Sequence, residues 1–199
     1  MALDLYVVRH GGTAWTVSGQ HTGRTDLALL PEGEEEARRL GQHLRGIPFA
    51  AAFSSDRQRA LRTAELAGVD RPTVTPLLRE YDYGEYEGVT SREIRARRPD
   101  WELWRDGCPG GETPAQVLAR AREFIAVVAG RMAGREGAVA AFSHGHLLRA
   151  LAVAWLDLDV TAAAGLDLDT ASVGILHDGD RGRLVRRWNW LDRLAPAAG

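Results

Sequence analysis

The sequence has no lysine and a single cysteine. All 25 basic residues are arginine, so mechanisms that need a Schiff-base lysine or the lysine of a nucleotide-binding P-loop are excluded. Cys108 alone cannot form an intrachain disulfide, which favours a reducing compartment. The sequence therefore predicts a cytoplasmic protein whose chemistry depends on other side chains.

Long runs of one character are also missing. No stretch approaches the roughly 20 apolar residues of a membrane span, and no long block of like charge occurs. The net charge is −2, which does not favour nonspecific binding to nucleic acid or to a membrane surface. The length of 199 residues suits one domain, predicted to cover 1–199.

Short apolar runs alternate with amphipathic segments along the chain. Such alternation predicts an α/β fold with a largely parallel sheet. The segment 80–112 is the least regular part and is interpreted as a flap. The predicted strands are Leu3–Val8, Phe49–Phe53, a short one at Val74, Ala138–Phe142, Ser172–Leu176 and Leu184–Trp188. The predicted helices are Pro31–Arg45, Asp56–Ala67 with Asp56 as N-cap, Thr90–Arg97, Thr113–Ala133 and Leu147–Leu156.

Charged and imidazole side chains follow these strands. The first strand ends in Arg9-His10-Gly11, and Arg59 lies on the helix after the second strand. Glu80 comes after the third strand, in a loop with other acids, and His144 follows AVAAF. Because the carboxyl ends of strands in open α/β sheets form the ligand site, we expect these side chains to converge.

This set suits phosphoryl transfer through a phosphohistidine. Arginine binds phosphate oxygens with two donors, and a neutral histidine is a nucleophile. A second imidazole, protonated or donating, stabilises charge, and a carboxylic acid protonates the leaving oxygen. No metal or cofactor is expected, and the pair His144 and His146 lacks the further ligands of a metal site. Other acids of the loop compete with Glu80 for the proton-transfer role: Asp82, Glu85 and Glu87.

The chain resembles the histidine phosphatase superfamily, also called the phosphoglycerate-mutase-like family. The resemblance is carried by four segments in the family's order: VVRHGGTAW with TGRTDLALLPEG, FSSDRQRALRTAE, LLREYDYGEYEG and FSHGHLLRA. It implies a three-layer sandwich, with helices on both faces of a mostly parallel sheet. It also implies that His10 is phosphorylated, that Glu80 is the acid and base, and that Arg9, Arg59 and His144 form the phosphate pocket.

Two positions depart from the family's pattern. Gly12 and Thr16 stand where the family often has Glu and Asn. Thr16 is still a candidate donor to phosphate, with a shorter reach. Further expected substrate contacts are Thr22, Gly23, Arg24 and Gly145, with Arg24 or Arg105 meeting a second phosphate. His146 is assigned to the pocket rim or to structure. His21 is a candidate for substrate contact, but assignment to the surface is favoured for it.

Within the family, SGQHTGRTD, WRDGCPGGET and SHGHLLRA look like the sedoheptulose bisphosphatase and acid phosphatase branch. That likeness predicts hydrolysis of small phosphate esters, such as sugar phosphates or bisphosphates. Only the residues 89–110 separate Gly88 from Gly111, which leaves little chain to shield a phosphoenzyme from water. A cofactor-dependent phosphoglycerate mutase and a non-catalytic phosphate-ester binder stay open as alternatives. So does a homodimer.

Overall fold

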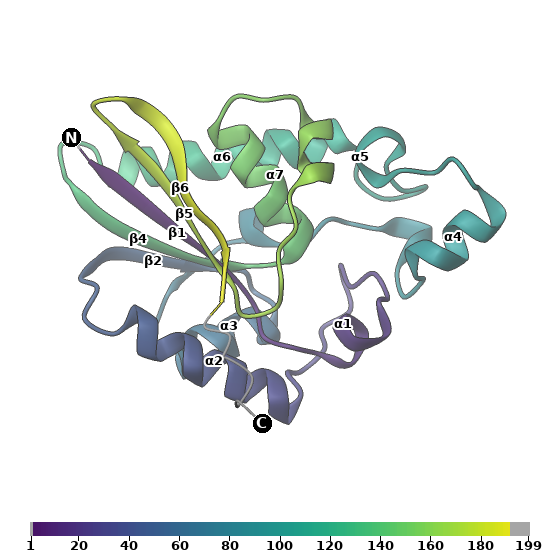
Figure 1. Ribbon diagram of the computed structural model, residues 1–199, viewed down its shortest axis with the longest axis horizontal. Coiled ribbons are helices and arrows are strands. Elements are labelled where there is room, and N and C mark those ends of the chain that lie inside the picture. Colours follow the sequence, from purple (N-terminus) through teal and green to yellow (C-terminus); the bar gives the residue numbers. More distant parts are fainter. Residues whose placement is uncertain (1, 192–199) are drawn as a thin grey trace, which may run out of the picture.

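The computed structural model describes residues 2–191 and contains a six-stranded sheet (Figure 1). The strand order is β3-β2-β4-β1-β5-β6. The first three neighbouring pairs are parallel, whereas β5 runs antiparallel to β1 and β6 antiparallel to β5. The strands are β1 (Leu3–Arg9), β2 (Phe49–Ser54), β3 (Thr73–Val74), β4 (Gly137–Ser143), β5 (Val173–Gly179) and β6 (Gly182–Trp190). The predicted α/β class with a mostly parallel sheet is confirmed.

Helices cover both faces of the sheet, which gives the expected three layers (Figure 1). On one face lie α2 (Pro31–Leu44) and α3 (Gln58–Leu66), and on the other α6 (Pro114–Arg131) and α7 (Gly145–Trp155). Three short helices, α1 (Ala14–Ser18), α4 (Ser91–Arg97) and α5 (Leu103–Asp106), lie beyond the carboxyl ends of the parallel strands. None of these described helices is long and apolar enough to cross a membrane.

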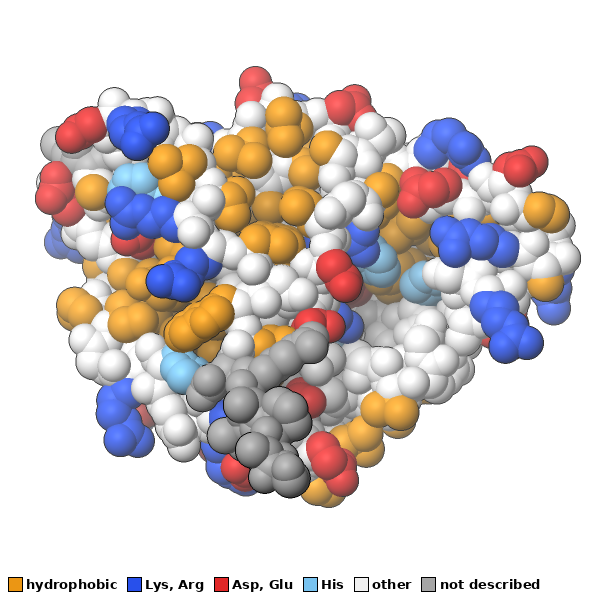
Figure 2. Space-filling model, viewed as in Figure 1, with side chains coloured by type: hydrophobic (Ala, Val, Ile, Leu, Met, Phe, Trp, Pro, Cys, Tyr) orange, Lys and Arg blue, Asp and Glu red, His pale blue; other side chains and the backbone are white. Residues whose placement is uncertain are grey.

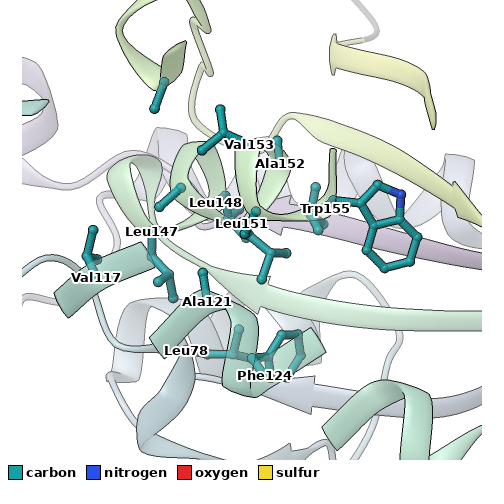
Figure 3. Close-up of a cluster of buried hydrophobic side chains, with 14 of the residues drawn as sticks. Leu78, Val117, Ala121, Phe124, Leu147, Leu148, Leu151, Ala152, Val153 and Trp155 are labelled. Atoms are coloured by element: carbon teal, nitrogen blue, oxygen red, sulfur yellow. The ribbon is translucent and has the colours of Figure 1, made fainter. Parts of the chain in front are cut away.

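The core is largest between the sheet and the pair α6 and α7 (Figure 3). Leu147, Leu151 and Trp155 of α7 are at most 1% exposed because this helix is apolar on nearly every side. Each such side chain contributes about 1.5–3 kcal/mol by leaving water. A smaller cluster around Leu40 and Phe142 fills the opposite face. Because α7 is fixed along its length, its N-terminus is a rigid platform.

The start of α3 differs from the prediction. The helix begins at Gln58 with Arg57 at the N-cap, and no side chain of its own segment caps it. Asp56 instead pairs with Arg79, and the backbone N–H of Gln58 donates to Asp26 Oδ1 at 2.9 Å. Asp56 as N-cap was therefore wrong, because a carboxylate distant in sequence occupies that place.

The segment 80–112 packs onto the rest of the chain in this structure. Tyr81, Tyr83 and Trp104 are at most 2% exposed. At Gly111 the chain crosses its own earlier part, so that a Cβ there would lie 2.2 Å from the Asp82 carbonyl oxygen. An isolated bridge joins Thr90 to Gln20. The segment therefore closes over one side of the strand ends, and its interpretation as a flap stays a prediction about motion.

Candidate active site

A cavity of about 210 Å³ opens at the carboxyl ends of β1 and β4. Arg9 and His10 line it from the end of β1, Glu80 from the turn after β3, and Gly145 from the start of α7. Figure 2 shows the molecule hollowed in this region, with histidine side chains on the wall. Arg59 and His144 are fully buried directly behind His10. The five predicted catalytic residues therefore meet, although they are spread over more than half of the chain.

The ring of His10 is held in one tautomer. Its Nδ1 lies 2.8 Å from the carbonyl oxygen of Gly11. Because a carbonyl only accepts hydrogen bonds, Nδ1 carries the hydrogen and Nε2 keeps its lone pair. Burial, reinforced by the charges of Arg59 and Arg9, holds the pKa of His10 well below 6.5. The imidazole is neutral at physiological pH, which is the form of a nucleophile.

Close backbone packing fixes the loop that carries His10. A Cβ on Gly11 would lie 2.3 Å from the carbonyl oxygen of Gly33, so only glycine fits at this crossing. The N–H of Gly11 donates to Thr63 Oγ1 at 3.1 Å, and that of Gly12 to the Glu36 carboxylate at 2.9 Å. Gly12 stands where the family often has Glu, and in this chain Glu36 of α2 brings a carboxylate to that spot.

Arg59 and His144 form a buried pair. Arg59 Nε donates to His144 Nδ1 at 3.1 Å, while its other nitrogens donate to the carbonyl oxygens of Thr25 and Thr22 at 2.9 and 3.0 Å. The His144 hydrogen therefore sits on Nε2, which is 2.9 Å from Ser55 Oγ. Burial and the charge of Arg59 keep the pKa of His144 well below 6.5. Of the two states expected for this imidazole, the structure supports the neutral, donating one.

Arg9 has a donor left over. One terminal nitrogen donates to the carbonyl oxygen of Leu168. Its Nε is buried without a hydrogen-bond partner among residues 2–191. A Cβ on Gly145 would be 3.3 Å from this guanidinium, so the glycine gives Arg9 its room. A partly buried cation with an unused, buried Nε donor beside His10 suits a phosphate oxygen.

Glu80 is tied to the N-terminus of α7. Its Oε1 accepts from the N–H groups of Tyr81 and Leu147 at 2.8 and 2.9 Å, and Oε2 from that of His146 at 3.1 Å. Of the four acids in this loop, it is the one that lines the cavity with His10. The others face elsewhere: Asp82 pairs with Arg24, Glu87 accepts from the N–H groups of Gly23 and Thr25, and Glu85 is exposed.

The predicted substrate contacts divide into two groups. Thr16, Thr22 and Gly145 line the cavity, but the hydroxyl of Thr16 is engaged with Thr13 in the capping box of α1. Gly23 and Arg24 line a neighbouring cleft of about 450 Å³ instead. Arg24 is 70% exposed and lies 2.5 Å from Asp82. The structure thus does not bring Arg24 to His10, and Arg105 pairs with Asp106 away from both spaces.

Several cavity residues were missed or misjudged. For His21 the surface was favoured over substrate contact, but this residue is 6% exposed, lines the cavity and stacks on Tyr83, with ring centroids 4.6 Å apart. The surface assignment was wrong because the segment 80–112 covers this residue, whereas the alternative of substrate contact stays a prediction. Arg149 and Asp167 also line the cavity. Arg149 lies in the segment FSHGHLLRA but was given no role, and no motif marked Asp167. The position of Tyr83, three residues after Glu80 in the segment LLREYDYGEYEG, could have indicated that its side chain lies near the cavity.

The geometry gives no support for a metal site or for a cysteine nucleophile in the part of the chain that the structure describes. Among the described residues, no group of three or more His, Cys, Asp or Glu side chains lies close enough together to hold a metal ion. Cys108 is buried, and burial raises the pKa of its thiol to about 12. A thiol that stays protonated is not a nucleophile at physiological pH.

Comparison with known proteins gives consistent matches over nearly the whole chain. The Histidine phosphatase superfamily (branch 1) matches residues 5–191. The chain is 42% identical to an acid phosphatase of Mycobacterium tuberculosis, over 86% of this chain and 84% of that protein. It is 38% identical to a sedoheptulose 1,7-bisphosphatase of Saccharomyces cerevisiae, over 77% and 68%. A solved structure of an open reading frame from Mycobacterium tuberculosis superposes with a TM-score of 0.89 and 38% identity, covering 94% and 97%.

Proposed function

The chain belongs to the histidine phosphatase superfamily, as its motifs predicted, and from this premise we propose that it hydrolyses small phosphate monoesters through a phosphohistidine at His10. The observation that carries the proposal is the free Nε2 of His10. It is fixed by the Gly11 carbonyl, and His10 lines one cavity with the partly buried Arg9 and the carboxylate of Glu80. A protein that only binds phosphate esters needs neither the nucleophile nor the acid.

In the first step, His10 Nε2 attacks phosphorus in line with the leaving oxygen. The P–N bond forms while the P–O bond to the alcohol breaks, and Glu80 gives its proton to the departing oxygen. The guanidinium groups of Arg9 and Arg59 stabilise the negative charge on the other phosphate oxygens. Their place beside His10 requires no movement, because backbone carbonyls hold both.

In the second step, water attacks the phosphohistidine. Glu80, now a carboxylate, takes the proton from this water, the P–N bond breaks and inorganic phosphate leaves. His10 returns to its neutral form with Nδ1 still bonded to Gly11. Glu80 can serve both steps because three N–H groups keep its carboxylate in one position.

The test is inorganic phosphate release from a panel of esters by the wild type and by His10→Ala. We expect release to fall by about 10⁴-fold or more in the variant, for every ester, because the nucleophile is gone. The matched control is His43→Ala, whose imidazole contacts Trp190 and does not line the cavity. Activity of His10→Ala above about a tenth of wild type would contradict the nucleophile assignment.

The same reactions separate hydrolysis from mutase action. A mutase would release little phosphate, interconvert phosphoglycerates and require priming by a bisphosphate. A binder would do neither. A chelator should leave the rate of phosphate release unchanged, because arginine side chains neutralise the phosphate in this mechanism. Loss of activity that added metal restores would contradict that mechanism.

The expected partner is a small phosphate ester, with no role for nucleic acid or membranes. We place the enzyme in the cytoplasm because its one cysteine favours a reducing compartment. A homodimer stays a prediction, to be tested by light scattering of the purified chain.

A further inference from the structure

The outer half of the catalytic cavity holds aromatic and imidazole groups that the mechanism does not use. His21 and His146 line it on either side of Tyr83. Both line the cavity together with Glu80, the residue that protonates the leaving oxygen in the proposed mechanism, so they are placed to meet the leaving group. Their chemistry therefore bears on which alcohol the enzyme accepts.

Tyr83 fixes the hydrogen of His146. The Tyr83 hydroxyl lies 2.6 Å from His146 Nδ1. Burial, with the charge of Glu80, raises the pKa of Tyr83 well above 10, so the phenol keeps its proton and donates it. Burial, with the charge of Arg149, keeps the pKa of His146 well below 6.5, so this imidazole is neutral. A neutral imidazole that accepts at Nδ1 carries its hydrogen on Nε2.

No residue within 2–191 is hydrogen-bonded to that Nε2–H. The bond from Tyr83 to Nδ1 orients the ring, which also packs against Trp104, with centroids 5.6 Å apart. His146 thus offers the cavity one fixed hydrogen-bond donor without a charge. Such a donor matches a hydroxyl or ether oxygen of the leaving group.

The fixed charges of the outer wall cancel. Arg149 lies over the Trp104 ring, 5.3 Å from its centroid, and donates to the carbonyl oxygen of Ala163. The carboxylate of Asp167 lines the same wall. Burial lowers the pKa of Arg149, and the charge of Asp167 raises it again. Burial also lowers the pKa of His21 below 6.5, so both imidazoles are neutral and no net positive charge remains for a second anionic group. Burying such a group without a partner is costly.

The arginine-rich cleft next to the cavity shares Glu80 with it, but none of the arginines of the cleft lines the cavity. It is lined by Arg24, Arg57, Arg79 and Arg120 together with Gly23 and Glu80. Three of these arginines already pair with Asp82, Asp56 and Glu112. His10 and His146 line the cavity and not this cleft.

We propose that the outer wall selects monophosphates whose leaving group is small, uncharged and hydroxylated, and that His146, positioned by Tyr83, is the donor that recognises it. The proposal rests on the proposed phosphatase function and names its substrate class. It places sugar and polyol monophosphates above bisphosphates and phosphorylated carboxylic acids.

The first test compares matched esters with the wild-type protein. Glycerol 3-phosphate is paired with 3-phosphoglycerate, and fructose 6-phosphate with fructose 1,6-bisphosphate. We expect kcat/KM to be at least about tenfold higher for the uncharged member of each pair, the effect of one unpaired buried charge at its smallest. Equal values, or a preference for the anionic member, would overturn the proposal.

The second test removes the donor. In His146→Phe, we expect kcat/KM for glycerol 3-phosphate to fall about 10- to 100-fold more than kcat/KM for p-nitrophenyl phosphate, which has no hydroxyl to lose a bond. His146→Gln, which keeps an N–H donor, should recover part of the difference, and Tyr83→Phe should repeat part of the loss. His43→Phe is the control for an imidazole outside the cavity.

The outcomes distinguish the two proposals. If p-nitrophenyl phosphate is hydrolysed with dependence on His10 but His146→Phe lowers both esters equally, the leaving-group proposal is wrong and the phosphatase function stands. If no ester is hydrolysed, the phosphatase function itself is wrong. Melting temperatures of all variants show whether a loss comes from unfolding.

Discussion

The two halves of the catalytic cavity are built by different means. In the inner half, backbone groups hold the nucleophile and the acid: Gly11 holds His10, and the first turn of α7 holds Glu80. In the outer half, side chains hold one another: His21 stacks on Tyr83, which bonds to His146. Backbone contacts follow from the fold, whereas side-chain contacts change with a single substitution. The positions of the nucleophile and the acid therefore follow from the fold, whereas the outer half suits adjustable specificity.

The comparison makes a general expectation. Substitutions in the inner half should reduce turnover of every ester, because they remove groups that act on the phosphorus itself. Substitutions in the outer half should change the ranking of esters and leave the common chemistry in place. The two variants already described represent the two cases. His10→Ala should lose turnover of every ester, and His146→Phe should lose turnover of some esters more than of others.

The largest further effect is expected for Glu80→Gln, which keeps the shape of the side chain but cannot give or take a proton. We expect kcat for an alkyl phosphate to fall about 10²- to 10⁴-fold. The loss should be smaller for p-nitrophenyl phosphate, if breakage of the P–O bond limits its rate, because its leaving oxygen needs little protonation. Steady-state kinetics with both esters measures the difference.

Glu85→Gln is the matched control for this experiment. Glu85 is exposed in the same loop and does not line the cavity. A similar loss in both variants would mean that the loop, and not the proton of Glu80, had been disturbed. The inner half would then lack the acid that the mechanism requires.

The second effect concerns the backbone that supports His10. In Gly11→Ala, the new Cβ would meet the carbonyl oxygen of Gly33 at 2.3 Å, a backbone atom that cannot turn away. We expect the free energy of unfolding to fall by about 2 kcal/mol or more, as for other overpacked sites. Urea denaturation gives the value, and kcat should fall with it because the tautomer of His10 depends on this loop.

Gly130→Ala is the matched control for Gly11→Ala, and its expected effect on stability has the opposite sign. Gly130 lies in α6, and a Cβ there meets nothing within 4 Å. Alanine in a helix is more favourable than glycine, so this variant should gain about 0.5–1 kcal/mol. If the two variants had equal stability, the close approach of Gly11 to Gly33 would not be the constraint described.

The third effect is a dependence of stability on pH. The pKa values of His10 and His144 are held well below 6.5 in the folded protein, chiefly by burial. Below pH 6.5 the unfolded chain binds protons that the folded chain does not, so stability falls as the pH falls. Each group contributes about 1.4 kcal/mol per pH unit, until its folded pKa is reached. Above pH 6.5 this contribution is complete.

Urea denaturation at pH 7.5, 6.5 and 5.5 measures this slope. His10→Ala should have a shallower slope than wild type below pH 6.5, because one buried imidazole is gone. For the same reason, protonation of His10 should not lower kcat/KM between pH 7 and 6. An unchanged slope in the variant would show that the buried imidazole of His10 does not resist protonation.

The sequence predicted the inner half of the cavity better than the outer half, for a physical reason. His10 and His144 directly follow buried strands, so local pattern and topology together place them. His21 is buried by contacts with Tyr83 and Trp101, which lie more than 60 residues away, and no local pattern reports such packing. Ser55, bonded to His144, lies in the segment FSSDRQRALRTAE, but no role was predicted for it.

The fold was also predicted well in some parts and missed in others. Strands and long helices were predicted to within a few residues, because apolar spacing marks them. The short helices α1 and α5 were not predicted, since four or five residues carry too little periodicity. The antiparallel course of β5 was also missed, because apolar spacing does not give the direction of a strand.

The smallest effect is expected for Arg24→Ala, and it separates the cavity from the neighbouring cleft. Arg24 is 70% exposed, and its partner Asp82 lies outside the cavity that holds His10. Exposed ion pairs contribute little, so kcat/KM should change by no more than about twofold for glycerol 3-phosphate and for fructose 1,6-bisphosphate alike. If Arg24→Ala instead weakened only the bisphosphate, by tenfold or more, the cleft would be a second phosphate site after all. The specificity of the enzyme would then depend on the arginines beyond Glu80, and the uncharged outer wall would not decide it.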